Sequence, residues 1–550
     1  MRKLGLVLMV LLVAGFGFAE GAQETGEDGL KEYDVFLGYP KEDYPDEGTI
    51  LGDWIEEQTG VRINWEFIVG DLEQRVGIMA ASGDYPDAIH PRNEGQILLD
   101  AGAYIPLDDL IAEYGENIEE IYGDWFELIR RDDGNIYWLP HVMPYGEEYR
   151  TPTVPHALYV QQRVLEANDY EVPGTLEEAV DMLIEYAKDN PETNDYPTKA
   201  FTGLFWSWRE FPVINAPSIF SGHPNDALVS VDMENGRWTA KTYWDKEEAY
   251  RTYKLYNDMY LEGLYDEEAF VMDYDQYLAK LSTGSILGFY DQPWQFQQVQ
   301  NQMLEADNGM WYVPLPVVLE GYEEEYQNPP QPQFSEGIAI SVDADDPEGL
   351  MQYFNFLADW DTMKRRLWGR EGIDYMVDDD GRFYRTEEQV TRWRDSDWVN
   401  WEYGAAYWTN FLRVDPGSFY PDGINSVGPG GQPSVFQMTL RDNEKEALAG
   451  LGVETWAEMF DPPNLERSTY FPAWTITFET GSTAQITGER INEVRRKYIP
   501  LLVMAEEGEY DEVWDEFLSE YNNIPREDRQ AFLNAAQAAI DARVEAAGGY

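Results

Sequence analysis

The sequence predicts an α/β fold in which mostly parallel sheets are flanked by helices. Strand and helix patterns alternate in a β-α-β-α-β order over the first 90 residues, an order typical of parallel sheets with helices on their faces. The alternation continues beyond residue 150. Because the chain has 550 residues, 43% of them hydrophobic, it is long enough for roughly two to four domains.

The N-terminal elements follow one another at short intervals. The predicted strands are 33–39, 61–67 and 88–89, and the predicted helices are 50–58 and 71–81. The run 61–67 alternates apolar and polar residues, as a half-buried strand does. Gly60 ends the first helix, and the turn 83–87 follows the second.

The later elements alternate in the same way and end in helices. The predicted strands are 158–160, 285–290 and 336–342, and the predicted helices are 176–188, 245–261, 346–359, 510–521 and 526–546. Thr175 begins the first of these helices, and Glu178 is expected to complete a capping box. Pro293 is expected to end the strand before it, and Pro525 suits the start of the last helix.

Charge and composition exclude several classes of protein. The net charge is −65, from 39 Lys and Arg against 104 Asp and Glu, and there is no Cys. A disulfide scaffold and a cysteine zinc site are therefore impossible, and a polyanion repels nucleic acid. Aromatic residues at 15% argue against disorder. The acidity suggests a surface that stays hydrated in a saline medium, with ordinary acidic drift as the alternative.

The N-terminus has the pattern of a signal peptide. A basic start is followed by the apolar run 4–18 and then by small residues. We expect residues 1–21 to be a signal peptide cleaved after Ala19 or Gly21, with a retained anchor as the alternative, and 22–32 to be a flexible leader. The mature chain is then exported to the periplasm or the extracellular space. No Cys follows the run, which excludes a lipid anchor there.

A series of motifs occurs in an order that resembles the extracellular solute-binding protein family 1 of ABC transporters, in its longer lipoprotein-type branch. The segments that carry the resemblance are LGDWIEEQTGVRINWEF (51–67), ASGDYPDAI (81–89), GAYIPLDDLIAEYGENI (102–118), DDGNIYWLP (132–140), STGSILGFYDQPW (282–294) and REGIDYMVDDDGRF (370–383). The branch's lipid-anchoring Cys is missing. Many members carry a glycine-containing Ca²⁺ loop where this chain has DNPETND (189–195), so no metal is predicted.

The resemblance implies a two-lobed, type II periplasmic-binding-protein fold with hinge crossings, extra C-terminal helices and a ligand cleft between the lobes. Lobe I would comprise 33–145 and about 290–340, and lobe II 146–289 and about 341–550. The chain would be a monomer that binds an oligosaccharide or another small solute and docks on the membrane subunits of an ABC permease. Because no Walker A motif is present, ATP hydrolysis belongs to a partner. No catalytic residue or cofactor is predicted.

Candidate ligand contacts come from loops that follow strands, where ligands bind in open α/β sheets. They are Tyr39, His90, Arg92, Asn93, Trp206, Trp208, Trp294, Trp401 and Trp474. Trp206 and Trp208 are placed on one strand face after 201–205. Trp294 falls where a maltose-binding relative has a sugar-stacking Trp. For the Trp residues the alternative is core packing, and for Arg92 and Asn93 it is a solvated loop. Trp401 is taken from an aromatic cluster that either lines the cleft or fills lobe II. Its members are Trp393, Trp398, Trp401, Tyr403, Tyr407 and Trp408.

These residues favour a neutral sugar as the ligand. Aromatic rings stack on the apolar face of a sugar, and planar donors and carboxylates bind its hydroxyls. A strongly acidic chain disfavours a polyanionic ligand. The alternatives are a secreted glycoside hydrolase that uses two carboxylates and a carbohydrate-binding surface or sensor module without transport. The four His residues form no HExxH motif, so a catalytic zinc site has little support.

Overall fold

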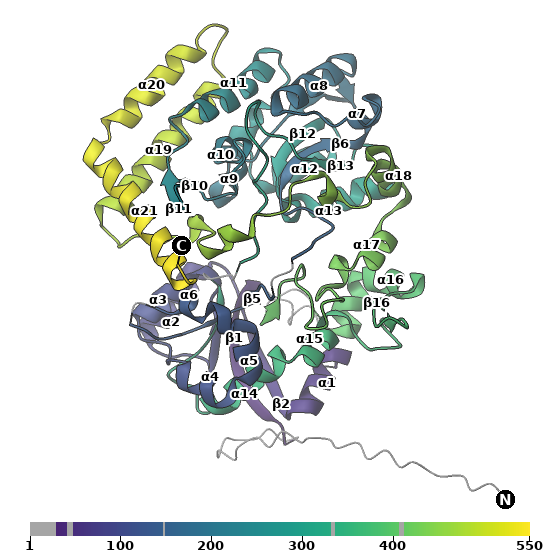
Figure 1. The fold of residues 1–550 in the computed structure, drawn as a ribbon, viewed down its shortest axis with the longest axis vertical. Coiled ribbons are helices and arrows are strands. Elements are labelled where there is room, and N and C mark those ends of the chain that lie inside the picture. The colour runs from purple at the N-terminus through teal and green to yellow at the C-terminus, as the bar shows by residue number, and fades with distance from the viewer. Residues whose placement is uncertain are drawn as a thin grey trace, which may run out of the picture. The chain divides into compact units, whose positions relative to one another are not determined.

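The computed structural model describes residues 29–40, 48–131, 133–146, 149–331, 336–405 and 412–549, and the chain divides into two compact units (Figure 1). Unit 1 comprises the described residues of Met1–Met143, Gln333–Asp374 and Thr391–Val414. Unit 2 comprises those of Pro144–Pro332, Tyr375–Val390 and Asp415–Tyr550. The predicted signal peptide and most of the predicted leader lie outside the described residues.

Unit 1 is built on a five-stranded mixed sheet in the order β2-β1-β3-β14-β4. Its strands are β1 (Lys31–Pro40), β2 (Val61–Ile68), β3 (Ala88–His90), β4 (Leu139–Pro140) and β14 (Gly337–Ile340). β1 pairs in parallel with β2 and β3, as the βαβ pattern predicts. β14 arrives from far along the chain and pairs antiparallel with β3 and β4.

Several helices of unit 1 are capped by side chains. Thr49 accepts a hydrogen bond from the first turn of α1 (Ile50–Thr59), which ends at Gly60 in the left-handed region (φ 68°). Asp71 caps α2 (Leu72–Ser82) in the same way. The other helices of the unit are α3 (Gly95–Asp100), α4 (Asp108–Tyr114), α5 (Glu116–Tyr122), α6 (Phe126–Ile129), α14 (Pro347–Ala358), α15 (Trp360–Leu367), and short turns η1 (Arg92–Glu94), η2 (Gly123–Trp125) and η5 (Trp398–Tyr403).

Unit 2 is built on a four-stranded sheet in the order β13-β6-β12-β9. Its strands are β6 (Ala157–Gln161), β9 (Lys199–Phe201), β12 (Ile286–Asp291) and β13 (Tyr312–Leu315). β6 runs antiparallel to both of its neighbours, and only β12 and β9 are parallel. The α/β class is therefore confirmed, but the sheets are mixed instead of mostly parallel.

Several two-stranded ribbons accompany the main sheets. They are β5 (Val142–Met143) with β17 (Arg413–Val414), β7 (Glu192–Thr193) with β8 (Tyr196–Pro197), β10 (Ser230–Glu234) with β11 (Arg237–Lys241), and β15 (Met376–Val377) with β16 (Phe383–Tyr384). The first lies in unit 1 and the others in unit 2.

Helices make up most of the rest of unit 2. They are α7 (Gln162–Ala167), α8 (Leu176–Asp189), α9 (Phe211–Ile214), α10 (Ala216–Phe220), α11 (Glu247–Leu261), α12 (Tyr274–Ser282), α13 (Pro293–Ala306), α17 (Pro433–Thr439), α18 (Asp442–Leu451), α19 (Thr483–Val503), α20 (Tyr510–Asn523) and α21 (Arg526–Ala546). Short 3₁₀ turns are η3 (Ser207–Glu210), η4 (Glu267–Phe270), η7 (Pro429–Gly431), η8 (Trp456–Met459), η9 (Leu465–Thr469) and η10 (Ala473–Thr475). The helix α16 (Glu387–Arg394) begins in a range assigned to unit 2 and ends in a range assigned to unit 1.

The prediction for Thr175 holds only in part, whereas the prediction for Pro293 is confirmed. Thr175 caps α8 by accepting from Glu178 N at 3.2 Å, but the Glu178 carboxylate accepts from Gly174 N, so the capping box is not closed on Thr175. Pro293 does end the strand before it, but it also opens α13, where proline fits because the first turn needs no backbone donor.

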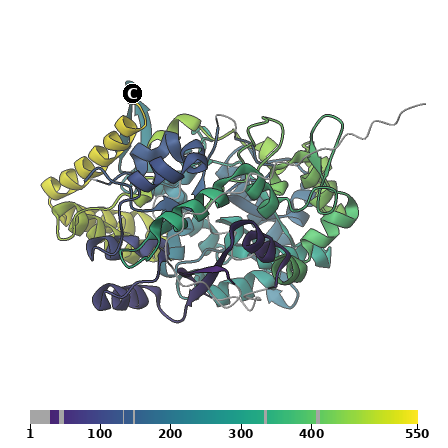
Figure 2. The same ribbon diagram turned by 90° about the horizontal axis from the view of Figure 1, so that it is seen from below.

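The C-terminal helices form a group within unit 2. α19 packs against α11, α20 and α21, and Figure 2 shows the α20–α21 part of this group in yellow from below. Arg495 of α19 is buried and donates to Asn215 Oδ1 at 2.9 Å and to the Tyr243 hydroxyl at 2.8 Å. These bonds satisfy a buried charge and fix α19 to the core.

The structure divides the chain differently from the predicted lobes. Residues 290–331 belong to unit 2, because β13 completes the sheet that contains β12 and β6. Residues 341–374 belong to unit 1, because α14 packs against α4 and α5. The described residues of 391–414 also belong to unit 1, where β17 pairs with β5.

Candidate functional site

Five side chains gather at one edge of the unit 1 sheet, and we call them the Tyr39 cluster. Tyr39 lies near the end of β1, His90 at the end of β3, and Arg92 just beyond it. Because β14 runs antiparallel to β3, and β4 antiparallel to β14, Glu336 at the start of β14 and His141 after β4 reach the same edge. This is the edge where ligands bind in open α/β sheets.

Direct contacts hold the Tyr39 cluster together. The Tyr39 hydroxyl donates to Glu336 Oε2 at 2.9 Å, and the Arg92 guanidinium lies 4.9 Å from the centre of the Tyr39 ring. Arg92 Nη2 is 3.9 Å from Glu336 Oε1. The rings of His90 and His141 are 5.1 Å apart, and His141 Nδ1 is 4.0 Å from Glu336 Oε2. The cluster thus arranges donors and one aromatic ring around a single carboxylate.

Both histidines of the cluster are buried and uncharged. Burial lowers the pKa of His90 to about 4, and burial, with His90 and Arg413 nearby, lowers the pKa of His141. The Arg92 backbone N–H donates to His90 Nδ1 at 3.4 Å, which places the ring proton on Nε2. Among the described residues this buried Nε2 has no hydrogen-bond partner. It is therefore a donor that a ligand hydroxyl would satisfy.

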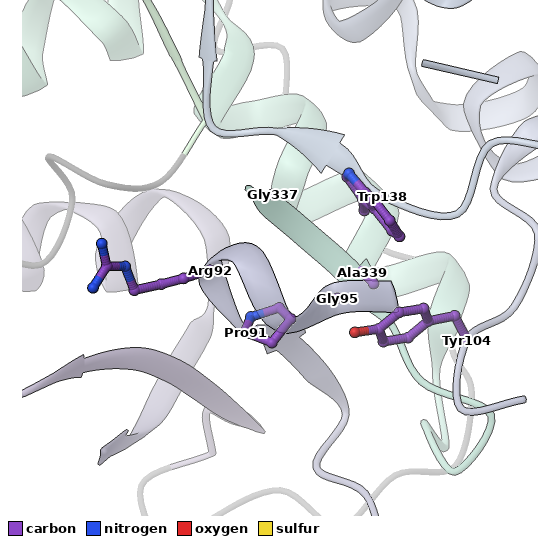
Figure 3. Close-up of a pocket in the computed structure, with 7 residues that line it drawn as sticks. All are labelled: Pro91, Arg92, Gly95, Tyr104, Trp138, Gly337 and Ala339. Atoms are coloured by element: carbon purple, nitrogen blue, oxygen red, sulfur yellow. The ribbon is translucent and has the colours of Figure 1, made fainter. Parts of the chain in front are cut away.

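A narrow crevice adjoins the cluster. Figure 3 shows Tyr104 and Trp138 on one side of it and the Arg92 side chain extending the other way. Gly337 also lines the crevice, and a Cβ there would lie only 2.4 Å from the Leu139 carbonyl oxygen, so glycine permits the close pairing of β14 with β4. The guanidinium of Arg92 is directed toward the Tyr39 cluster instead of the crevice.

A second group, which we call the Trp platform, lies in unit 2 and consists of Trp208, Arg209, Phe211, Tyr274 and Trp294. Because β9 and β12 are adjacent and parallel, the segments that follow them start from the same sheet edge. Trp208 lies in η3, which follows β9, and Trp294 is the second residue of α13, which follows β12.

The indole rings of the platform are stacked and exposed. Trp208 and Trp294 stack with their centroids 5.7 Å apart and 17° between their planes, and Phe211 stacks on Trp294 at 6.3 Å. Trp208 is 59% exposed and Trp294 is 48% exposed, so neither fills the core. The Trp294 indole N–H donates to the Gln292 side chain, which orients the ring. Exposed, oriented indoles suit the apolar face of a sugar.

Arg209 braces the platform from within. Its guanidinium lies 3.9 Å from the centre of the Tyr274 ring and 4.5 Å from that of Trp208. Arg209 Nη1 donates to Gln295 Oε1 at 2.8 Å, and Gln295 Nε2 donates to Asp291 Oδ1 at 2.6 Å. A chain of side chains therefore runs from the exposed rings to the buried end of β12, and such a chain keeps the rings in a fixed arrangement.

Asp291 makes the stability of unit 2 sensitive to pH. Burial raises its pKa to about 7, against the opposing effect of hydrogen bonds from Gln292 N, Tyr277 and Gln295. The folded chain then binds this proton more tightly than the unfolded chain. The free energy of unfolding should fall as pH rises from about 4 to about 7, by at most about 4 kcal/mol from this group. Urea unfolding at pH 5 and pH 8 measures this fall.

The control for this prediction is a pair of matched variants. Asp291→Asn should lose this part of the pH dependence, whereas Asp361→Asn, whose carboxyl is 90% exposed, should behave as the wild type does. Equal pH dependence in wild type and Asp291→Asn would show that Asp291 does not titrate differently on folding.

The remaining predicted residues lie elsewhere. Trp206 and Trp208 do not share a strand face, because Ser207 between them has φ 54° and Trp208 lies in η3; Trp206 is exposed. Asn93 is exposed in η1 beside Arg92. Trp474 is 44% exposed in η10, a turn in which Ala473 N donates to buried Asp226 at 2.8 Å.

Trp401 lies in unit 1, not in the second lobe. It is 44% exposed in η5, next to a packed group in which the Trp393 ring lies 5.4 Å from Trp398 and 4.9 Å from Tyr403. Those three rings pack on one another within unit 1, whereas the alternative expectation placed such packing in lobe II. The cluster's other predicted members, Tyr407 and Trp408, lie outside the described residues.

Several residues of both groups were not predicted from the sequence. Glu336 precedes its strand, so it is not among the residues that follow strands. His141 directly follows the motif DDGNIYWLP (132–140), whose last two residues form β4. Arg209 and Gln295 meet through the fold alone. Their neighbours Trp208 and Trp294 are the only local indication.

The described part of the chain contains neither a metal-binding cluster nor a membrane-spanning helix. Within it, no group of three or more His, Asp or Glu side chains is arranged to hold a metal ion. No helix among the described residues has the length and apolar character needed to cross a membrane.

Known proteins resemble this chain in sequence and in fold. The fructooligosaccharide ABC transporter substrate-binding protein FusA of Streptococcus pneumoniae is 28% identical over 250 residues, which is 43% of this chain and 45% of FusA, so the match spans less than half of that relative. A solved structure of FusA in complex with kestose has a TM-score of 0.62 at 17% identity and covers 93% of this chain and 99% of its own.

Two other solved structures share the fold. An HMO-binding, ABC-transporter-associated solute-binding protein from Bifidobacterium longum infantis has a TM-score of 0.65 at 17% identity, over 94% of this chain and 99% of its own. The alginate-binding protein AlgQ2 has a TM-score of 0.59 at 17% identity, over 93% and 98%. The family model for the bacterial extracellular solute-binding proteins matches residues 42–361, more than half of the chain. The chain therefore belongs to the bacterial extracellular solute-binding protein family.

Proposed function

We propose that this protein is the exported substrate-binding component of an ABC importer and that it binds a neutral oligosaccharide. The observation that carries the proposal is the Trp platform, in which Trp208 and Trp294 are stacked, exposed and braced by Arg209. The names of the relatives support it, since FusA is named for fructooligosaccharides and a second fold neighbour for HMO binding.

The platform supplies the apolar half of sugar recognition. A pyranose or furanose ring places its C–H face on an indole, and the contact removes apolar surface from water on both sides. The Tyr39 cluster offers the polar groups that hydroxyls need, namely the N–H of His90 and the carboxylate of Glu336. We infer that both groups bind sugar. The predicted ligand cleft between two lobes stays a prediction.

The charge of the cluster favours a neutral sugar over a uronate. Arg92, its one permanent cation, already lies beside Glu336, and both histidines are uncharged. The chain as a whole carries a net charge of −65, which repels a polyanion. The fold itself does not decide the question, because a neighbour of similar fold is named for alginate binding.

Calorimetry with a panel of oligosaccharides tests the proposal. Kestose, a milk-type tetrasaccharide and a maltotriose represent neutral ligands, and an alginate trisaccharide represents uronates. At least one neutral sugar should bind in the micromolar range or more tightly, as dedicated binding sites do, and the uronate should bind more weakly than that sugar. Tight binding of the uronate alone would overturn the assignment to a neutral sugar.

The finer parts of this function are also proposals. We propose that residues 1–21 are removed on export, with cleavage after Ala19 or Gly21, and that the mature chain acts as a monomer with the membrane subunits of a permease. N-terminal sequencing of the secreted protein tests the cleavage. Light scattering, which determines the mass of the particle in solution, tests whether the chain is a monomer. An N-terminus at Met1 would contradict cleavage.

Export into a saline medium predicts that salt stabilises the fold. With a net charge of −65, repulsion between surface carboxylates destabilises the compact state, and added ions screen that repulsion. The melting temperature should therefore rise as NaCl is added, and KCl at equal ionic strength should act alike. A melting temperature that is the same with and without salt would contradict this prediction.

A further inference from the structure

A cavity of about 300 Å³ lies within unit 2 and contains none of the Trp platform residues. One face of α13 forms a wall, β6 and β13 form the floor, and η8 and the start of α18 complete the rim. The volume is at the lower end of the range for small-molecule sites in proteins. It suits a ligand much smaller than an oligosaccharide.

The inner wall of the cavity is aromatic and rigid. Trp311 and Trp456 meet edge to face with their centroids 6.0 Å apart, and Phe296 meets Tyr159 in the same way at 4.8 Å. Gln300 fixes α13 to β13, because its side chain accepts from Tyr312 N at 2.9 Å and donates to Tyr312 O at 2.7 Å. The cavity is thus preformed, so a ligand would not have to order it.

The rim of the cavity is polar and carries unused hydrogen-bonding groups. Gln297 and Asn301 lie one turn apart on the exposed side of α13, and their carboxamides form no hydrogen bond with any described residue. The nearby Glu444 accepts from Arg441 N at 2.9 Å within the first turn of α18. The helix N-terminus compensates that negative charge, so the rim does not select a cation.

We propose that this cavity binds a single neutral sugar ring or a polyol of similar size. Aromatic edges and faces accept the apolar side of such a ring, and the two carboxamides bind adjacent hydroxyls as planar donors and acceptors. The site is separate from the Trp platform, although α13 contributes to both: Trp294 begins the helix, and Gln297 and Asn301 lie farther along it. Sugar binding in this cavity does not depend on a ligand being bound to the Trp platform.

The test uses a chain in which the platform is disabled. In Trp208→Ala/Trp294→Ala, saturation-transfer NMR and calorimetry with D-glucose, D-galactose and D-fructose should detect saturable binding of at least one sugar, at one site per chain and in the millimolar range or tighter. Adding Asn301→Trp should weaken that binding at least tenfold, because the indole fills the rim. Gln298→Trp is the matched control, since Gln298 is exposed on α13 and does not line the cavity.

Two results would overturn the inference. One is the absence of saturable binding for all three sugars in a variant that melts as the wild type does. The other is an equal loss of binding in Asn301→Trp and Gln298→Trp. Neither result bears on oligosaccharide binding by the wild-type platform, which is measured separately, so the two proposals fail independently.

Discussion

Trp294→Ala is expected to weaken oligosaccharide binding by about 1–3 kcal/mol, which raises Kd roughly 5- to 150-fold. Trp294 is 48% exposed and stacks between Trp208 and Phe211, so its removal deletes a contact surface for sugar without opening a core cavity. Calorimetric titration with the sugar that binds the wild type most tightly measures the change, and the melting temperature should shift little.

Tyr196→Ala is the matched control for this variant. Tyr196 is an aromatic side chain of the same unit and is 51% exposed in β8, but it has no place in the platform. Its replacement should leave Kd unchanged. If the two variants bind sugar equally well, or if Trp294→Ala unfolds before binding is lost, then Trp294 serves the fold and not the ligand.

Phe289→Ala is expected to lower the free energy of unfolding by about 3–5 kcal/mol. Phe289 is fully buried in the centre of β12, where its ring lies 4.7 Å from Tyr312 and 4.9 Å from Phe296. Truncation removes these contacts and leaves a cavity between the sheet and α13. Because the platform is built on the end of the same strand, sugar binding should weaken in proportion to unfolding. Urea unfolding with a binding measurement at each step follows both.

The conservative variant Phe289→Leu tests whether the loss in the free energy of unfolding comes from lost packing volume. It keeps most of the apolar volume and should cost less than half as much as the alanine variant. A loss of less than about 1 kcal/mol in Phe289→Ala would mean that the core around β12 collapses freely to fill the space, and that the strand is not the rigid base of the platform.

Local sequence patterns were enough to predict some of the elements, although others, such as α19 and β13, were not predicted. Gly60 ends α1, the alternation in 61–67 matches β2, and 526–546 matches α21. Each of these signals depends on residues a few positions apart, such as a cap, a period of two or an apolar stripe.

Pairing over long distances was harder to predict. β14 lies some 250 residues after β3 along the chain and pairs with it antiparallel. The sequence of neither strand indicates which strand it pairs with. The assignment of residues 290–331 depends in the same way on β13 pairing with β6. Short buried strands look alike from the sequence, because their side chains only have to be apolar.

The candidate site shows the same contrast between what local sequence predicts and what only the tertiary fold brings together. Residues at or just after the carboxyl ends of parallel strands, such as Tyr39, His90 and Trp294, could be found from the sequence, because these ends meet at one edge of a sheet. Glu336 could not, since it precedes an antiparallel strand. Arg209 meets Gln295 across 86 positions in the chain, a contact that only the tertiary fold creates.

The most direct test of the central claim is to titrate the protein with the best-binding neutral oligosaccharide and to recover the ligand afterwards. We expect one platform-dependent binding event per chain, which is lost in Trp208→Ala/Trp294→Ala, and recovery of the sugar intact with no new reducing ends. Release of shorter sugars in amounts that exceed the protein would contradict it and would point to a glycoside hydrolase, whose two carboxylates cleave the glycosidic bond.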